Sequence, residues 1–269
     1  MPDHPLKNAR RRLEWANGEI TNLQTAVREF FKLKPYTVVV DEQSQPGRKI
    51  YKAEIFADIP DDWQRKVVHI AGDLRSPVDY AVRRVMEQDP VSFAQFKEHH
   101  RSLPVCRDAV ALERELRQRK ILAVYPVLGD FILQDIKPYP RGNRLLCNLD
   151  ALNNSKKHRD LYPIGMAAPS MSVNMHIRSS SYFSLPGSAG GGYHLGSSEK
   201  SVVLFEIASD AEFDGNLQVS LDVALAQVEG FERQPLTRSL SEIANEVERI
   251  LTAFEEKCFT PGHHSPPGT

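Results

Sequence analysis

The chain has 269 residues, of which 41% are hydrophobic and 26% charged, so its composition is that of an ordinary globular protein able to bury a large core. Lysine and arginine together number 34 against 35 acidic residues, and this balance excludes a global field that would attract nucleic acid or an anionic membrane. A nucleic acid or another phosphate-containing ligand would therefore need a local basic patch.

Cysteine usage and hydropathy bear on the compartment. The cysteines Cys106, Cys147 and Cys258 are far apart and odd in number, which favours a reducing compartment, and the cytoplasm is the expected location. The longest apolar run, residues 121 to 129, is much shorter than a bilayer span, and the charged N-terminus lacks the apolar segment of a secretory signal. We therefore expect no membrane association and no export.

Both ends of the chain carry helical periodicity. From Leu6 to Phe30, apolar residues recur at a three-four spacing, which predicts a long helix over residues 4 to 32. The same spacing recurs after Pro235 and predicts a C-terminal helix over residues 236 to 257. These two helices are expected to pack together. The stripe could equally be the seam of a homodimer, because a heptad pattern does not identify its partner.

The next predicted elements are a hairpin and a second helix. Two β-rich runs flank the turn residues Ser-Gln-Pro-Gly, which predicts a β-hairpin within residues 36 to 59. A helix is predicted over residues 62 to 88, and its apolar positions keep helical phase through Pro77. We therefore expect one kinked helix rather than two.

The middle of the chain is expected to be helical and irregular. Residues 89 to 105 are interpreted as a connection, and residues 106 to 119 as a charged helix. The apolar residues 121 to 136 predict a buried helix broken near Pro126, and the proline-rich residues 137 to 143 force a turn.

A short helix over residues 144 to 157 precedes a change of period. Its buried face is predicted to consist of Leu145, Leu149 and Leu152. Beyond residue 163, apolar and polar residues alternate, and strands follow in series without intervening helices, which predicts an antiparallel sheet. The glycine-rich residues 184 to 200 are interpreted as a long flexible loop between two of these strands.

The sequence thus predicts an α+β protein, in which a helical layer with long N- and C-terminal helices packs on a mainly antiparallel β-sheet. We predict a single domain over residues 1 to 258, helix-rich from 1 to 160 and β-rich from 161 to 230. Most of the sheet is expected from residues 170 to 228, with the early hairpin as a further contributor. Residues 259 to 269 are predicted to be a disordered tail.

Several motifs that suggest chemistry fail their specific tests. The glycines of residues 188 to 198 are consecutive, and neither Gly-Lys-Ser/Thr nor a helix follows, so a hairpin loop is favoured over a phosphate cradle. His69 and Asp73 lie one helical turn apart, which is more often a surface hydrogen bond than a pair of metal ligands. We expect no metal and no cofactor. No nucleophile elbow or activated cysteine is evident.

The strongest candidate site combines two stretches of the chain. Arg75 and Asp79 are four residues apart on the predicted second helix and share a face at the margin of its apolar stripe. The later stretch lies at the end of the short helix, where cations complement the helix dipole. It supplies Asn153, Lys157, His158 and Arg159. The Asp79 carboxylate can pair with the arginine or the histidine across a helix interface.

These stretches resemble motifs of a family of bacterial proteins without an established activity, in which a Leu-Arg-Ser-Ala-Leu-Asp-Tyr/His helix precedes a Leu-x-x-x-Asp-Lys-His-Arg turn. The matching positions are Leu74, Arg75, Ser76, Asp79, Tyr80, Lys157, His158 and Arg159. The chain departs from the pattern at Pro77, where the family has alanine, and at Lys156, where it has aspartate. The resemblance implies that Tyr80 belongs to the candidate site, but it names no reaction.

The helical part is more distantly similar to HEPN domains, helical bundles that include RNA-cleaving toxins. Active members separate the arginine and histidine of their signature by more residues than separate Arg65 from His69, so the catalytic signature is absent. This resemblance implies one of the noncatalytic, binding versions.

Two interpretations of the candidate site stay open. In the favoured one, the cluster is a buried salt-bridge network, and the protein is a noncatalytic binding or interaction module whose binding residues are Arg75, Tyr80, Asn153, Lys157 and Arg159. In the alternative, His158 acts as general acid or base with Asp79 orienting it, in a histidine-dependent phosphodiester or nucleic-acid-processing enzyme. A third option is a homodimer whose terminal helices form a regulatory seam.

Overall fold

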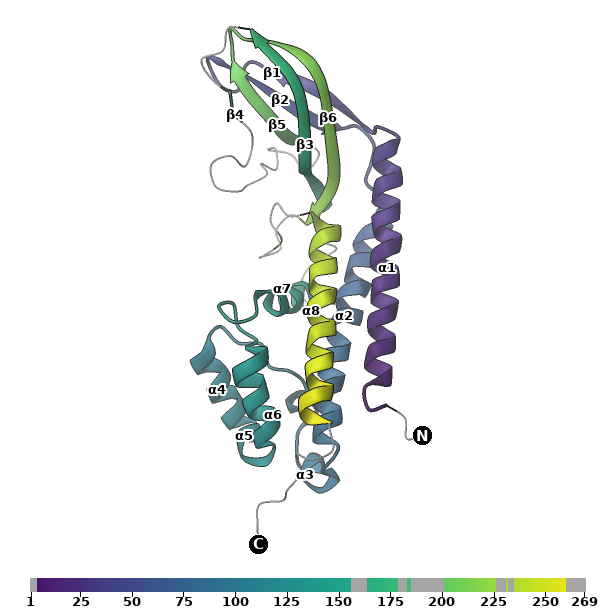
Figure 1. Ribbon diagram of the computed structural model, residues 1–269, viewed down its shortest axis with the longest axis vertical. Helices are drawn as coiled ribbons and strands as arrows, with labels where there is room; N and C mark the ends of the chain where they lie inside the picture. Colours follow the sequence, from purple (N-terminus) through teal and green to yellow (C-terminus); the bar gives the residue numbers. More distant parts are fainter. Residues whose placement is uncertain are drawn as a thin grey trace. The chain divides into compact units, whose positions relative to one another are not determined.

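The computed structural model describes residues 4–155, 164–178, 183–184, 201–225, 231 and 235–259. Figure 1 shows the helices and strands, and the predicted α+β class is confirmed. The predicted loop after Ser184 and the predicted tail beyond residue 259 lie outside the described residues. In chain order the elements are α1 (Lys7–Lys32), β1 (Tyr36–Asp41), β2 (Arg48–Ile55), α2 (Asp62–Met86), α3 (Pro90–Ala94), the 3-10 turn η1 (Glu98–His100), α4 (Ala109–Gln118), α5 (Ile121–Val124), α6 (Pro126–Phe131), the π-helical turn η2 (Ile132–Ile136), α7 (Arg144–Ser155), β3 (Ile164–Arg178), β4 (Phe183–Ser184), β5 (Ser201–Ala208), β6 (Glu212–Leu225) and α8 (Leu236–Cys258).

Contacts within the chain divide it into two compact units, each built from segments far apart in sequence. Unit 1 comprises Met1–Ile20, Val67–His158 and Ser241–Thr269, and unit 2 comprises Thr21–Lys66 and Arg159–Leu240. The long helices α1, α2 and α8 each contribute residues to both units. The single domain over residues 1 to 258 stays a prediction.

The first half of α1 buries its apolar stripe inside unit 1. The stripe residues Leu6, Ala9, Leu13, Ala16 and Ile20 are at most 3% exposed. Arg10 Nε donates to Oε1 of Glu255 on α8 at 2.9 Å, and the same guanidinium also pairs with Glu248. The predicted packing of the two terminal helices within one chain is confirmed. This part of the stripe is therefore already covered and cannot serve as a dimer seam.

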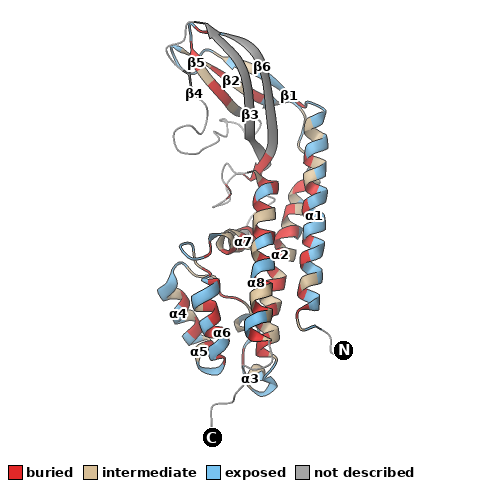
Figure 2. Cartoon of the chain, in the orientation of Figure 1, coloured by how far each residue is buried: buried red, intermediate tan, exposed pale blue. Residues whose placement is uncertain are grey.

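Helix α2 runs unbroken through Pro77, as the continuous apolar phase predicted. Apolar residues on both sides of the proline, including Leu74, Val78, Ala81 and Val82, are fully buried in unit 1. Burial of this stripe outweighs the loss of one helical hydrogen bond at the proline. Figure 2 shows buried residues alternating mainly with partly buried ones along α2.

The middle segment follows its sequence signals closely. Asp108 caps α4, where its side chain accepts a hydrogen bond from the backbone N–H of Ala111 at 2.7 Å. The apolar residues after it split into α5 and α6 at Pro126, as predicted. Gly129 permits the close approach of these two short helices, because a Cβ at this position would lie 2.6 Å from Cδ2 of Leu122.

The buried face of α7 differs by one residue from the prediction. Leu149 and Leu152 are fully buried as expected, but the third buried leucine is Leu146, whereas Leu145 is only partly buried. Adjacent residues on a helix point about 100° apart, so the prediction of Leu145 placed the face one position too early.

The predicted hairpin is confirmed as β1 and β2, which pair antiparallel from Tyr36 opposite Ile55 to Asp41 opposite Ile50. The Asp41 carboxylate closes the turn by accepting hydrogen bonds from the backbone N–H groups of Gln43 and Ser44 at 3.0 and 2.9 Å.

The four predicted later strands are present and antiparallel, but they do not form the single sheet that was predicted. β1, β2, β5 and β4 form one sheet in that order, whereas β3 and β6 form a separate two-stranded ribbon. The core of the larger sheet holds Leu204, Phe205 and Ile207 of β5, with Phe30 and Phe31 of α1 packed against it. Alternation predicts strands but not their partners, because pairing is decided by contacts distant in sequence.

Candidate functional site

Helix α2 and the residue directly after it carry four charged residues at a regular spacing of four. We call Arg75, Asp79, Arg83 and Glu87 the charged ladder. They lie on one face because four residues are close to one helical turn, and their signs alternate along it. Arg75 pairs with Asp79 at 3.0 Å and Arg83 with Glu87 at 2.9 Å. All of the ladder belongs to unit 1.

The first ladder pair, Arg75 and Asp79, forms hydrogen bonds with both backbone polar groups of Leu103. Nη2 of Arg75 donates to the carbonyl oxygen of Leu103 at 2.5 Å, and the Leu103 N–H donates to Oδ1 of Asp79 at 3.0 Å. Nε of Arg75 donates to Oδ2 of Asp79 at 3.1 Å, which closes the arrangement. The Arg75 side chain is 9% exposed, so these partners compensate for the loss of water around its positive charge. We call this set of contacts the Leu103 clamp.

Arg75 also faces helix α7. Its Nη1 lies 3.5 Å from Oδ1 of Asp150 but makes no hydrogen bond. The other Asp150 oxygen accepts a hydrogen bond from Nδ2 of Asn154 at 2.8 Å. Arg75 therefore faces α7 through Asp150, a residue that the sequence analysis did not select.

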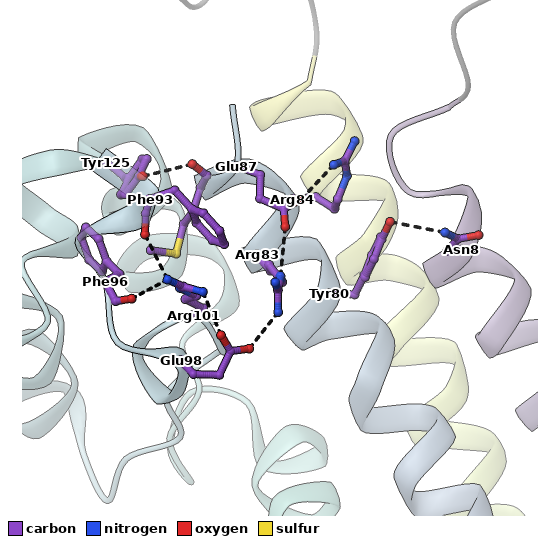
Figure 3. A network of polar contacts seen from close by, with 11 residues as sticks. Asn8, Tyr80, Arg83, Arg84, Glu87, Phe93, Phe96, Glu98, Arg101 and Tyr125 are labelled. Carbon is purple, nitrogen blue, oxygen red and sulfur yellow. Dashed lines mark hydrogen bonds and ion pairs between the residues drawn. The ribbon is translucent and has the colours of Figure 1, made fainter. Parts of the chain in front are cut away.

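The remaining predicted site residues lie in different surroundings. The Tyr80 hydroxyl accepts a hydrogen bond from Nδ2 of Asn8 at 3.5 Å, so this residue contacts α1 (Figure 3). Asn153 is partly buried on α7. Lys157, His158 and Arg159 lie outside the described residues, so the pairing predicted between Asp79 and His158 stays a prediction.

The second half of the ladder holds the segment after α2. Arg83 and Arg101 each donate to one oxygen of Glu98 at 2.8 Å, and Figure 3 shows the Glu98 carboxylate between the two guanidinium groups. Arg101 also donates to the carbonyl of Phe96 at 2.6 Å, and its Cζ lies 4.1 Å from the centre of the Phe93 ring. The residues interpreted as a connection are therefore fixed to α2 by ion pairs.

The ladder also influences the pKa of Glu87. Burial acts to raise this pKa, but hydrogen bonds from Arg83 and Arg84 hold it below its ordinary value.

The sequence analysis did not select Arg83 or Glu87, although they continue the spacing of Arg75 and Asp79 by two further turns. Nothing in the sequence marks Glu98 and Arg101 as their partners.

The thiols of Cys106 and Cys147 offer little reactivity. Burial raises the pKa of Cys147 to about 11 and also raises the pKa of Cys106, so both thiols are protonated at neutral pH. Asp73, the predicted companion of His69, lies 3.8 Å from Arg12. Within the part of the chain that the structure describes, no three His, Cys, Asp or Glu side chains are grouped so that they could hold a metal ion.

A shallow hollow of about 340 Å³ lies between α7 and α8 within unit 1. It is lined by Leu145, Glu242, Asn245, Glu246 and Arg249. The Glu246 carboxylate at its edge already accepts hydrogen bonds from Asn143 and Arg249, both at 2.6 Å. The hollow does not include Arg75 or Asp79.

Comparison with known proteins gives no match: no family model, no curated protein and no solved structure is significantly similar to the chain. Among the described residues, no helix combines the length and hydropathy required to span a bilayer.

Proposed function

We propose that the protein is a noncatalytic binding or interaction module in which Arg75 and Asp79 have a structural role. The observation that carries this proposal is the occupancy of the Asp79 carboxylate. One oxygen accepts the N–H of Leu103, and the other accepts Nε of Arg75. A carboxylate that orients a catalytic histidine must offer that histidine an acceptor site, and donors from the chain itself already hold one site on each oxygen of Asp79.

The charge pattern favours a protein partner over a polyanion. Positive and negative residues are nearly equal in number, at 34 and 35. The guanidinium groups of Arg75, Arg83 and Arg101 are engaged by carboxylates of the same chain, so they are less available to phosphate. The three cysteines are free, which suits a reducing compartment, and we assign the protein to the bacterial cytoplasm.

One observation favours the alternative of a histidine-dependent phosphodiester or nucleic-acid-processing enzyme. Asp150 on α7 lies 3.5 Å from Arg75, so the chain that leads on to His158 passes beside the Leu103 clamp. In this alternative, Asp79 would accept a hydrogen bond from the histidine at one of its remaining acceptor sites.

An activity assay separates the two functions. The purified chain is incubated with single-stranded RNA, single-stranded DNA and a chromogenic phosphodiester, beside the variants His158→Ala and Asp79→Asn. We expect no turnover above that of buffer. Turnover that both variants lower by about a hundredfold or more, the usual effect of losing a general acid or base, would overturn the proposal. Turnover unchanged in both variants would leave the structural role of Arg75 and Asp79 intact, but it would overturn the noncatalytic role, because the activity would arise elsewhere in the chain.

A further inference from the structure

An exposed tryptophan marks the outer face of α1. Trp15 is 55% exposed, whereas Trp63, the other tryptophan of the chain, is 3% exposed. Tryptophan is usually well buried, and it is enriched among the residues that dominate protein interfaces. Trp15 and the first turns of α1 belong to unit 1, and Figure 2 shows exposed residues along this helix.

The three consecutive arginines that precede Trp15 differ in their partners. Arg10 is bound by Glu255 and Glu248 on α8, and Arg12 lies 3.8 Å from Asp73 on α2. Arg11 points outward, and its contact within the described residues is the Trp15 ring, whose centre is 5.3 Å from Cζ. Arg11 is exposed on this face of α1, so its guanidinium is accessible to a partner.

Gly18 places no side chain on the helix surface beside Trp15. A Cβ at this position would meet nothing within 4 Å, so packing inside the chain does not require a glycine. Glycine weakens a helix interior relative to alanine. What it provides here is a notch one turn after the indole, through which another backbone can approach α1 closely.

The exposed face of α1 carries opposite charges on either side of Trp15. Arg11 lies four residues before it and Glu19 four residues after it, and both are exposed. We call Arg11, Trp15, Gly18 and Glu19 the outer stripe. When such a stripe meets a copy of itself antiparallel about a two-fold axis at Trp15, each arginine lies opposite Glu19 of the partner subunit. A single stripe therefore supplies both halves of a complementary interface.

We propose that the outer stripe of α1 is a homodimer surface, on which a second copy of this chain packs antiparallel with the two Trp15 side chains in contact. The inference rests on the proposed interaction role and names its partner. It differs from the predicted seam, because that seam used the stripe now buried in unit 1. A polyanion fits less well, because Glu14 and Glu19 share the exposed face with Arg11 and Lys7. One helix crossing buries little area, so the dimer is weak, with a dissociation constant in the micromolar range or above.

Sedimentation equilibrium of the full chain over a wide concentration range tests this surface. We expect a monomer–dimer equilibrium that Trp15→Ala weakens about tenfold or more, as loss of a central aromatic residue does. Arg11→Glu and Glu19→Arg should each weaken it, and the double variant should restore it, because the exchange keeps opposite charges facing each other. Val110→Ala on α4, at a position 68% exposed, is the control and should change nothing.

Tryptophan emission provides a second readout. Since Trp63 is buried, a blue shift with rising concentration reports the covering of Trp15, and the shift should disappear in Arg11→Glu. A chain that stays monomeric, self-association unchanged by Trp15→Ala, or a double variant that fails to restore it would overturn the inference. Binding of a single-stranded oligonucleotide through Trp15 without self-association would also overturn it. These outcomes concern self-association only, whereas the noncatalytic role is tested by phosphodiester turnover, so failure of one proposal can be told from failure of the other.

Discussion

Replacing Asp79 with alanine removes the acceptor at the centre of the Leu103 clamp. The variant deletes the hydrogen bonds from Nε of Arg75 and from the N–H of Leu103, and it leaves a guanidinium whose side chain is 9% exposed. A hydrogen bond to a charged group contributes about 1.5–3 kcal/mol, and breaking a buried ion pair costs about 3–5 kcal/mol. Arg75 keeps the Leu103 carbonyl and Asp150 as partners, so we expect the free energy of unfolding to fall by about 3 kcal/mol.

Denaturant unfolding followed by circular dichroism measures this loss, and a helix neighbour provides a matched control. Asp73→Ala removes a carboxylate of similar exposure from the same helix, 36% against 31% for Asp79, but its partner Arg12 is 49% exposed and lies 3.8 Å away. Such a surface pair is worth about 0–1 kcal/mol. If Asp79→Ala costs no more than Asp73→Ala, Asp79 is not engaged in a closed structural pair, and the reasoning fails.

Three further predictions concern pH, thiols and glycine. Because arginine hydrogen bonds lower the pKa of Glu87, its contribution to stability is present above its ordinary pKa and is lost as pH falls through the lowered value. The stability difference between the chain and its Glu87→Gln variant should therefore shrink in acid, and a difference that stays constant to about pH 2 would contradict this. Burial raises the pKa of Cys147 to about 11 and of Cys258 to about 12, so a thiol reagent at neutral pH should react slowly with the folded chain and rapidly after unfolding; equal rates would refute it. Gly129→Ala should cost about 1–3 kcal/mol through overlap with α5, whereas Gly18→Ala should stabilise by about 0.5–1 kcal/mol, and denaturant unfolding that reversed this order would show that the two surroundings are misassigned.

The helices could be predicted because their signals are local. The stripe of α1 and the phase of α2 through Pro77 follow from spacing alone, and burial of apolar side chains then fixes the helix face. The strands could be predicted in the same way, but their pairing into sheets could not. The β2 strand pairs with β5, about 150 residues later, and alternation of apolar residues contains no information about that choice.

The candidate site was predictable to a similar extent. The spacing of Arg75 and Asp79 indicated their pairing, and the structure has it at 3.0 Å. Their shared partner, Leu103, could not be found, because it takes part through backbone N–H and carbonyl groups that every residue carries. Arg83 and Glu87 could have been selected from the sequence, because they repeat the same charge pattern two turns later.

Hydrogen exchange at the backbone amide of Leu103 tests the structural role of Asp79 most directly. This N–H donates to Oδ1 of Asp79 at 3.0 Å, so the account predicts strong protection in the chain as it stands. In Asp79→Ala, under conditions where the variant remains folded, the same amide should exchange far faster while amides in the middle of α2 keep their protection. Rapid exchange of the Leu103 amide in the unaltered chain, or protection that survives Asp79→Ala, would contradict a closed structural clamp and leave Asp79 available for chemistry.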